Sequence, residues 1–96
     1  MLDVAGPIQV FTAANERATS PHGRLPYETR VISPGGAEVR ATSGLAFATN
    51  PLPDPTAPLD TLIVAGGQGV MRAAEDAAVV DWLTTRAGAA RRTASV

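Results

Sequence analysis

Two stretches of this sequence carry residues whose types and spacing suit chemistry, and the first is a glycine turn. Gly66, Gly67, Gln68 and Gly69 follow directly on an apolar run at residues 61–65. Ligands of open α/β sheets bind just past the carboxyl ends of the strands, and unobstructed backbone N–H groups in such a turn can face an anion or an oxyanion. The alternative is a tight turn that only connects a strand to a helix.

The second stretch surrounds Asp3, which stands among apolar residues just before Gly6 and Pro7. A charge in such a place is costly unless it is paired or caps a helix. Asp3 therefore either caps the first helix or supplies a carboxyl group beside a nucleophile. We interpret Asp3 and the four residues of the glycine turn as candidates for a ligand pocket, with no complete catalytic set among the 96 residues.

Several other kinds of site are excluded for these residues. A dinucleotide fingerprint needs glycines two and five positions after Gly66, where Gln68 and Met71 stand. A Walker loop needs a lysine, and there is none; cysteine is absent, and His22 is the single histidine. We expect neither a metal nor a cofactor. The remaining acidic residues in the expected loops and on the polar helix faces are interpreted as solvated: Glu16, Glu28, Glu38, Glu75 and Asp81.

Net charge and hydropathy restrict the kinds of partner that this chain can bind. The formal net charge of −1 gives no field to hold nucleic acid or an anionic membrane, and we interpret Arg91 and Arg92 as a helix end. No apolar run approaches the roughly 20 residues of a membrane span, and the N-terminus lacks a signal-peptide pattern. These features predict a cytoplasmic protein without a membrane partner.

The helices and strands that must position these residues follow from periodicity and turn signals. We predict a helix over residues 6–18, extending back as far as Leu2, and a strand over residues 27–33. Two short strands are expected at residues 38–42 and 45–49. Residues 50–58 contain four prolines and are predicted to be a surface connection, neither helix nor central strand.

The second half of the chain predicts a parallel arrangement. The β-branched run at residues 61–65 is typical of a strand covered on both faces. Residues 70–75 are expected to form one or two helical turns, and residues 93–96 to open another buried strand. Asp76 is expected to cap a helix over residues 77–92. Its apolar stripe, flanked by Trp82, comprises Val79, Val80, Leu83, Ala87 and Ala90. Alternating helices and strands predict an α/β domain with a mainly parallel sheet.

The apolar residues supply a smaller hydrophobic core than their percentage suggests. Hydrophobic residues make up 45% of the 96-residue chain, and 18 of these residues are alanine. A chain of this size forms one domain, over residues 1–96, and buries a small fraction of its surface. With no disulfide or metal to help, the core is thin.

Several stretches, in order, resemble one family. Residues 2–11 are similar to the "LDLAGP…VF" segment of PfpI/ThiJ-like, class I glutamine amidotransferase-like domains, and closest to the N-terminal domain of GlxA-type regulators in the AraC family. The match continues through the Ser-Pro-Gly-Gly, Thr-Ser-Gly-Leu and glycine-turn segments and the last helix, at residues 33–36, 42–45, 59–70 and 77–96.

The resemblance implies a partial flavodoxin-like three-layer domain. Family members have a central strand that ends just before the segment resembling residues 2–7, and a nucleophile elbow, Ser-Val-Cys-Thr-Gly, whose first two residues match Ser95 and Val96. The resemblance therefore leads us to expect that this chain lacks the first strand, the cysteine, the second half of the domain and a helix-turn-helix domain.

Function is expected to follow the same resemblance. Asp3 is similar to the acidic residue that lies near the elbow cysteine of catalytic relatives, and Gly66 and Gly67 resemble glycines whose N–H groups form an oxyanion hole. The leading hypothesis is a fragment of the ligand-sensing and oligomerisation domain of an AraC-family regulator, non-catalytic as given. It implies a small-molecule effector, a homodimer in the full-length protein, and DNA contact only through a domain absent from this chain.

Two alternatives stay open. The same segments suit part of a cysteine enzyme of the PfpI superfamily, such as an isocyanide hydratase. The fragment could also have no function of its own.

Overall fold

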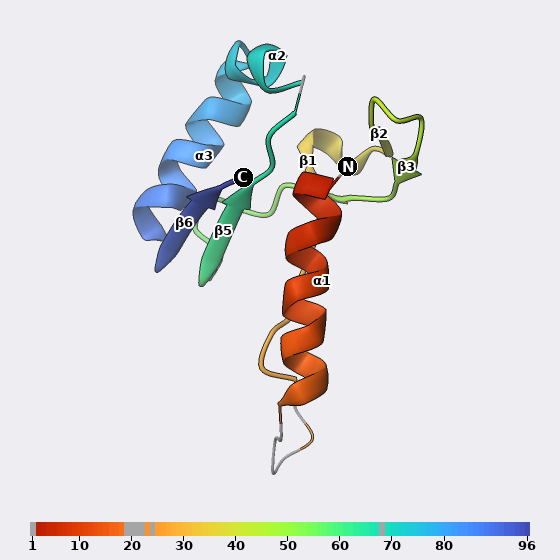
Figure 1. Cartoon of the computed structure of the whole chain (residues 1–96). Helices are drawn as coiled ribbons and strands as arrows, with labels where there is room; N and C mark the ends of the chain where they lie inside the picture. The colour runs from red at the N-terminus through yellow and green to blue at the C-terminus, as the bar shows by residue number, and fades with distance from the viewer. Residues whose placement is uncertain (1, 19–22, 24, 68) are drawn as a thin grey trace.

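The structure, a computed structural model, describes residues 2–18, 23, 25–67 and 69–96. It combines helices with three separate two-stranded sheets, two of them parallel (Figure 1). This mixture of helix and small parallel sheets agrees with the predicted α/β class, whereas the described strands form three separate pairs and not the one mainly parallel sheet that we predicted. In chain order the elements are α1 (Leu2–Arg17), β1 (Ile32–Ser33), the 3₁₀ helix η1 (Pro34–Gly36), β2 (Val39–Arg40), β3 (Ala46–Phe47), β4 (Asn50–Pro51), β5 (Thr61–Val64), α2 (Val70–Ala74), α3 (Ala77–Ala89) and β6 (Arg92–Ser95).

Helix α1 begins at Leu2, so the longer of the predicted extents is confirmed. Asp3 consequently lies inside the first turn, and its negative charge sits at the positive end of the helix dipole. Pro7 falls within the helix, where it has no N–H to give to the carbonyl of Asp3 four residues earlier. At the other end of α1, the Asn15 amide pairs with the backbone of Tyr27 through bonds of 2.9 and 3.0 Å.

The prediction for the first half of the sheet is partly wrong. Only Ile32 and Ser33 of the strand expected at residues 27–33 pair, and their partners are Asn50 and Pro51, in a segment that we predicted to be a connection. Pro51 tolerates this place because β4 is a two-residue exposed edge that needs no further N–H donor. The β2–β3 hairpin is confirmed, although each strand has only two residues.

The unit formed by β5, α2, α3 and β6 matches the prediction more closely. The strands β5 and β6 pair in parallel from Thr61 opposite Arg92 to Val64 opposite Ser95. The predicted burial of the two strands is wrong, because β6 is exposed along its length and Leu62 is the buried residue of β5. The carboxylate of Asp76 accepts hydrogen bonds from the backbone N–H groups of Ala78 and Val79, so the predicted cap is confirmed. Helix α3 ends at Ala89 rather than near residue 92 because Arg92 already belongs to β6.

The predicted stripe of α3 is confirmed only in part: Val79, Leu83 and Ala90 are half-buried. Trp82 and Arg86 are the residues of α3 that are buried, whereas Val80 is 39% exposed and Ala87 is exposed. The indole N–H of Trp82 donates to the Pro53 carbonyl at 2.7 Å, and Nη1 of Arg86 donates to the Pro55 carbonyl at 2.5 Å. Carbonyls in this proline-rich segment have no strand neighbour, so two side chains one helical turn apart satisfy them.

A charged cluster joins the beginning of β5 to the beginning of β6. Nε and Nη2 of Arg91 donate to Oδ1 and Oδ2 of Asp60 at 2.5 and 3.1 Å, and Nη2 of Arg92 lies 3.6 Å from Oδ2. The hydrogen bonds from Arg91 and from the Thr61 hydroxyl, together with the nearby positive charges, hold the pKa of Asp60 well below its ordinary value of 3.8.

Replacing Asp60 by Asn is expected to make the free energy of unfolding depend less on pH in the acidic range. Because the pKa is lowered in the folded state, the carboxylate stabilises that state above its ordinary pKa and loses this effect as the pH falls below about 4. Asp60→Asn should therefore be less stable than the natural sequence at pH 7, by a small amount because the pair is exposed, and the difference should shrink at pH 3. Urea unfolding midpoints at both pH values, measured on the natural protein that carries these residues and on the variant, give this difference, with Asp81→Asn as the control. A difference that is constant or larger in acid would contradict the assignment.

The molecule exposes more surface than its mass requires. A compact monomer of this mass would expose roughly 5200 Å², whereas this chain exposes 7117 Å². Leu62 and Trp82 are the buried apolar residues of the described chain, and Leu2, Val10 and Met71 are 66–80% exposed. No helix in the described ranges has the length and apolar character to cross a membrane.

Candidate functional site

The candidate site lies where β5 and β6 end, beside the beginning of α1. The chain leaves β5 through Ala65 into Gly66, whose N–H donates to the Val96 carbonyl at 2.7 Å, and the N–H of Val96 donates back to the Val64 carbonyl at 3.1 Å. The parallel pairing thus continues one step beyond the strands. It fixes the glycine turn against the residue that follows β6.

Asp3 and Gly66, which are 63 positions apart in the sequence, meet at this point. A Cβ atom added to Gly66 would lie 3.4 Å from Oδ2 of Asp3 and only 2.5 Å from the Val96 carbonyl oxygen. Side chains are not accommodated at the second distance, so the close approach of two backbones requires glycine here. The structure therefore brings together the two stretches that the sequence singled out, with the carboxylate beside the strand ends.

The other members of the glycine turn have different roles. Gly67 has a φ of 127°, which favours glycine, and its carbonyl accepts from the N–H of Val70 at 3.2 Å. Gly69 has ordinary helical angles and faces open space, with no atom within 4 Å of a Cβ placed there. Gln68 lies outside the described residues. The turn thus connects β5 to α2 and leaves open space at the surface beside Gly69.

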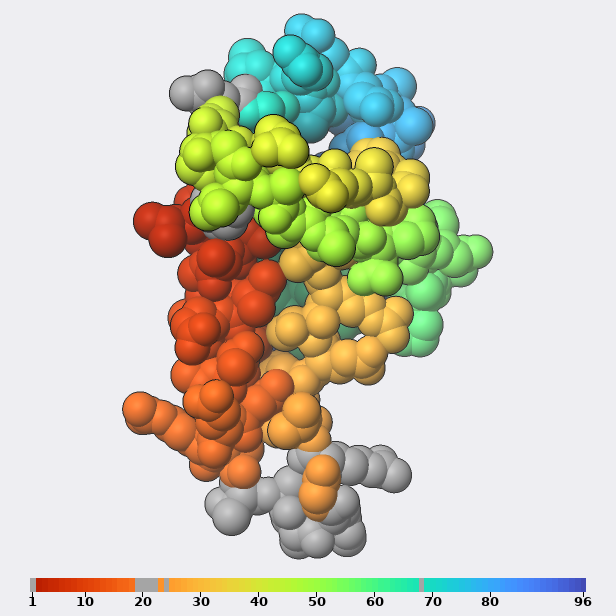
Figure 2. All heavy atoms as spheres, turned by 90° about the vertical axis from the view of Figure 1, so that its right-hand side faces the viewer, coloured from red at the N-terminus to blue at the C-terminus, as the bar shows by residue number. Residues whose placement is uncertain are grey.

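The four described candidates line one apolar groove of about 1260 Å³. One end of the groove is formed by Asp3, Gly66, Gly67 and Gly69, and one wall is formed by α1. In Figure 2, α1 and the segment near residue 30 lie side by side on the face turned to the viewer. The apolar lining comes from α1, β1 and β5, and includes Val4, Ile8, Phe11, Ile32, Leu62 and Ile63.

The hydrogen bonding limits what the turn can do by itself. The N–H of Gly66 is already used by the Val96 carbonyl, so it does not face an oxyanion in this structure. Asp3 contributes a carboxylate at the groove's end, half-buried. The described residues contain no group of three histidine, cysteine, aspartate or glutamate side chains that could hold a metal ion. The arrangement is that of a mainly apolar groove with the Asp3 carboxylate beside the glycine turn, and its lining also includes the charged residues Glu28, Arg30, Asp60 and Arg91.

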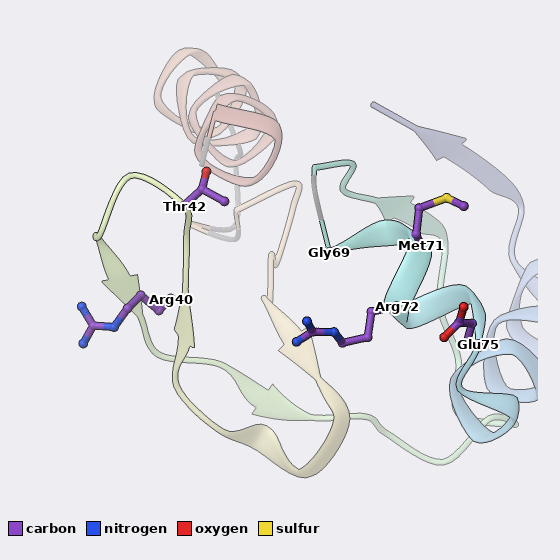
Figure 3. Close-up of a pocket in the computed structure, with 6 residues that line it drawn as sticks. All are labelled: Arg40, Thr42, Gly69, Met71, Arg72 and Glu75. Carbon is purple, nitrogen blue, oxygen red and sulfur yellow. The ribbon is translucent and has the colours of Figure 1, made fainter.

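A second, smaller opening was missed by sequence reasoning. It has a volume of about 580 Å³ and lies between the β2–β3 hairpin and α2. Gly69 belongs to it as well as to the groove, and its other lining residues are Arg40, Thr42, Met71, Arg72 and Glu75 (Figure 3). The sequence offers one signal, the Met71–Arg72 pair, which follows the glycine turn after Val70. His22, the single histidine, lies outside the described residues.

Comparison with protein-family models, with curated proteins and with solved structures found no match for this chain.

Proposed function

We propose that this chain is part of the ligand-sensing and oligomerisation domain of an AraC-family transcriptional regulator, a class I glutamine amidotransferase-like domain with a flavodoxin-like fold. The observation that carries the proposal is the meeting of Asp3, Gly66 and Val96 at the carboxyl ends of two parallel strands. The stretches that carry the resemblance stand far apart in the sequence. Their convergence on one point is the arrangement that the resemblance implies, and ligands of such sheets bind there.

The apolar groove supports the same proposal. It is lined by residues of both β1 and β5, which belong to different sheets, and its walls are mainly aliphatic and aromatic. The amidotransferase-like fold has a central strand before the segment similar to residues 2–7. We propose that such a strand, supplied from outside these 96 residues, occupies the groove and joins the β1–β4 and β5–β6 pairs into one sheet.

The regulator is preferred to an enzyme because residues 2–11 and the segments that follow are most similar to the N-terminal domain of GlxA-type regulators. Asp3 is the charged residue that stands beside Gly66 at the site. An effector bound at the groove's end would change how the domain packs against a second copy, and DNA would be contacted by another domain. The alternative, part of a PfpI-superfamily cysteine enzyme such as an isocyanide hydratase, is favoured by one observation, the carboxylate of Asp3 beside the end of β6.

The natural protein that carries these residues tests the proposal. Selection from a random pool of duplex DNA should enrich one sequence motif, whereas the 96 residues alone, with a net charge of −1, should enrich none. If the natural protein selects no motif, the regulator is wrong. Turnover of an isocyanide or of glyoxal tests the alternative, which fails if replacing the natural protein's elbow residue by Ala leaves the rate unchanged.

A further inference from the structure

The connection between the two parallel pairs is held against α3 by side chains. Residues 52–59, which we call the strap, join β4 to β5 and belong to no helix or strand. The indole N–H of Trp82 and Nη1 of Arg86 donate to the Pro53 and Pro55 carbonyls, respectively. Both donors belong to buried residues of α3, so their hydrogen bonds come from the strap and not from water.

The strap is stiff within itself. Its three prolines fix φ at their positions. The carbonyl of Asp54 accepts from the N–H of Ala57 at 2.9 Å, and Oδ1 of Asp54 accepts from the N–H and the hydroxyl of Thr56 at 2.8 and 2.6 Å. An aspartate that closes a turn in this way, between prolines, keeps the segment in one shape. The strap therefore moves as a unit.

The strap is attached more weakly than the strands beside it. None of its residues is fully buried, and in Figure 2 the green chain of residues 50–60 lies at the surface of the face turned to the viewer. The strands β5 and β6, in contrast, are held by a backbone ladder over four residue pairs. Segments with few buried contacts open at a lower cost in free energy than such ladders.

The strap and the face of α3 that it contacts both line the groove. The lining includes Pro53 and Ala57 from the strap and Trp82, Leu83 and Arg86 from α3. We propose that the strap is the movable wall of the groove. It swings off α3 as one unit before the β5–β6 ladder separates, and so widens the groove. Trp82 and Arg86 form the clasp that sets how often this happens.

The indole proton of Trp82 reports this movement directly, because it exchanges with solvent when the Pro53 carbonyl leaves it. Hydrogen exchange measured by nuclear magnetic resonance on the natural protein follows this proton, whose signal is the one that Trp82→Phe removes. Its protection should be lower than that of the β5 and β6 ladder amides by about tenfold or more. Equal protection would overturn the proposal, because the strap and the ladder would then open together.

Arg86→Met removes one hydrogen bond of the clasp and keeps a long apolar side chain. It should lower the protection of the Trp82 indole proton by about tenfold, because a hydrogen bond from a charged group is lost, and leave the ladder amides unchanged. Arg86→Lys, which keeps a charged donor, should lower the protection less. Unchanged indole protection in Arg86→Met, or an equal loss at the indole and in the ladder, would overturn the proposal.

Arg17→Met is the matched control for Arg86→Met, since Arg17 is exposed on α1 and does not line the groove. The indole proton should be protected in this variant as it is in the natural protein. The proposal concerns the wall of the groove and not its occupant. It therefore stands or fails independently of the DNA selection described above.

Discussion

The isolated 96-residue chain is expected to show no cooperative thermal unfolding and to aggregate or remain molten at neutral pH. Its exposed surface exceeds that of a compact monomer by an amount on the order of 2000 Å², more than the roughly 800 Å² that one partner buries in an interface of standard size. Leaving even ~400 Å² of apolar surface exposed to water lowers the free energy of unfolding by about 10 kcal/mol. That is the whole stability of a typical domain, roughly 5–15 kcal/mol.

Three measurements check this expectation. Near-ultraviolet circular dichroism reports whether Trp82 has a fixed environment, binding of an apolar dye reports exposed core, and light scattering after gel filtration reports mass. The natural protein is the control and should unfold cooperatively. A soluble 96-residue monomer with a single sharp transition would contradict the interpretation of the groove as a place for further protein.

Replacing Gly66 by Ala is expected to destabilise the folded natural protein by about 2 to 4 kcal/mol, because overpacking and a lost backbone hydrogen bond act together. The added Cβ would lie 2.5 Å from the Val96 carbonyl oxygen. Because this oxygen and Gly66 both belong to the backbone, neither can move aside without a large cost in free energy. The end of β6 would move away from the turn, and the Gly66–Val96 hydrogen bond would be lost. The carboxylate of Asp3 would lose its place beside them.

Gly69→Ala is the matched control for Gly66→Ala. Both changes add one methyl group to the same turn, but Gly69 has helical angles and no atom within 4 Å of the new Cβ. Its unfolding midpoint should stay within about 0.5 kcal/mol of the natural sequence, as for an unconstrained surface change. Chemical unfolding of both variants decides the matter. Equal stability of the two would show that the turn does not pack against the end of β6.

The second half of the fold could be predicted from sequence because its signals are local. The apolar run at residues 61–65, the capping residue Asp76 and the strand onset at residue 93 each dictate the conformation of their own neighbourhood. The first half was predicted less well. The pairing of Ile32 with Asn50 depends on how the chain returns after the hairpin, and residues 50 and 51 carry no strand signal of their own.

The candidate site was predictable in its parts but not in its geometry. Composition and position singled out Asp3 and the glycine turn, yet their meeting depends on where α1 lies relative to β5, which no local pattern specifies. The role of Arg86 was missed for a similar reason. A charged residue in an amphipathic helix is expected on the solvent side, and only the proline-rich segment above it explains its burial at 2% exposure.

The contacts that hold the candidate site differ in extent. Residues 60–96 are joined by the β5–β6 ladder and by the ion pair between Asp60 and Arg91, although these contacts link positions 31 apart in the sequence. Asp3 of α1 meets this unit beside Gly66, just past the end of the ladder. Because displacement of the first turn of α1 breaks no hydrogen bond of that ladder, we expect the site to open locally while β5 and β6 stay paired.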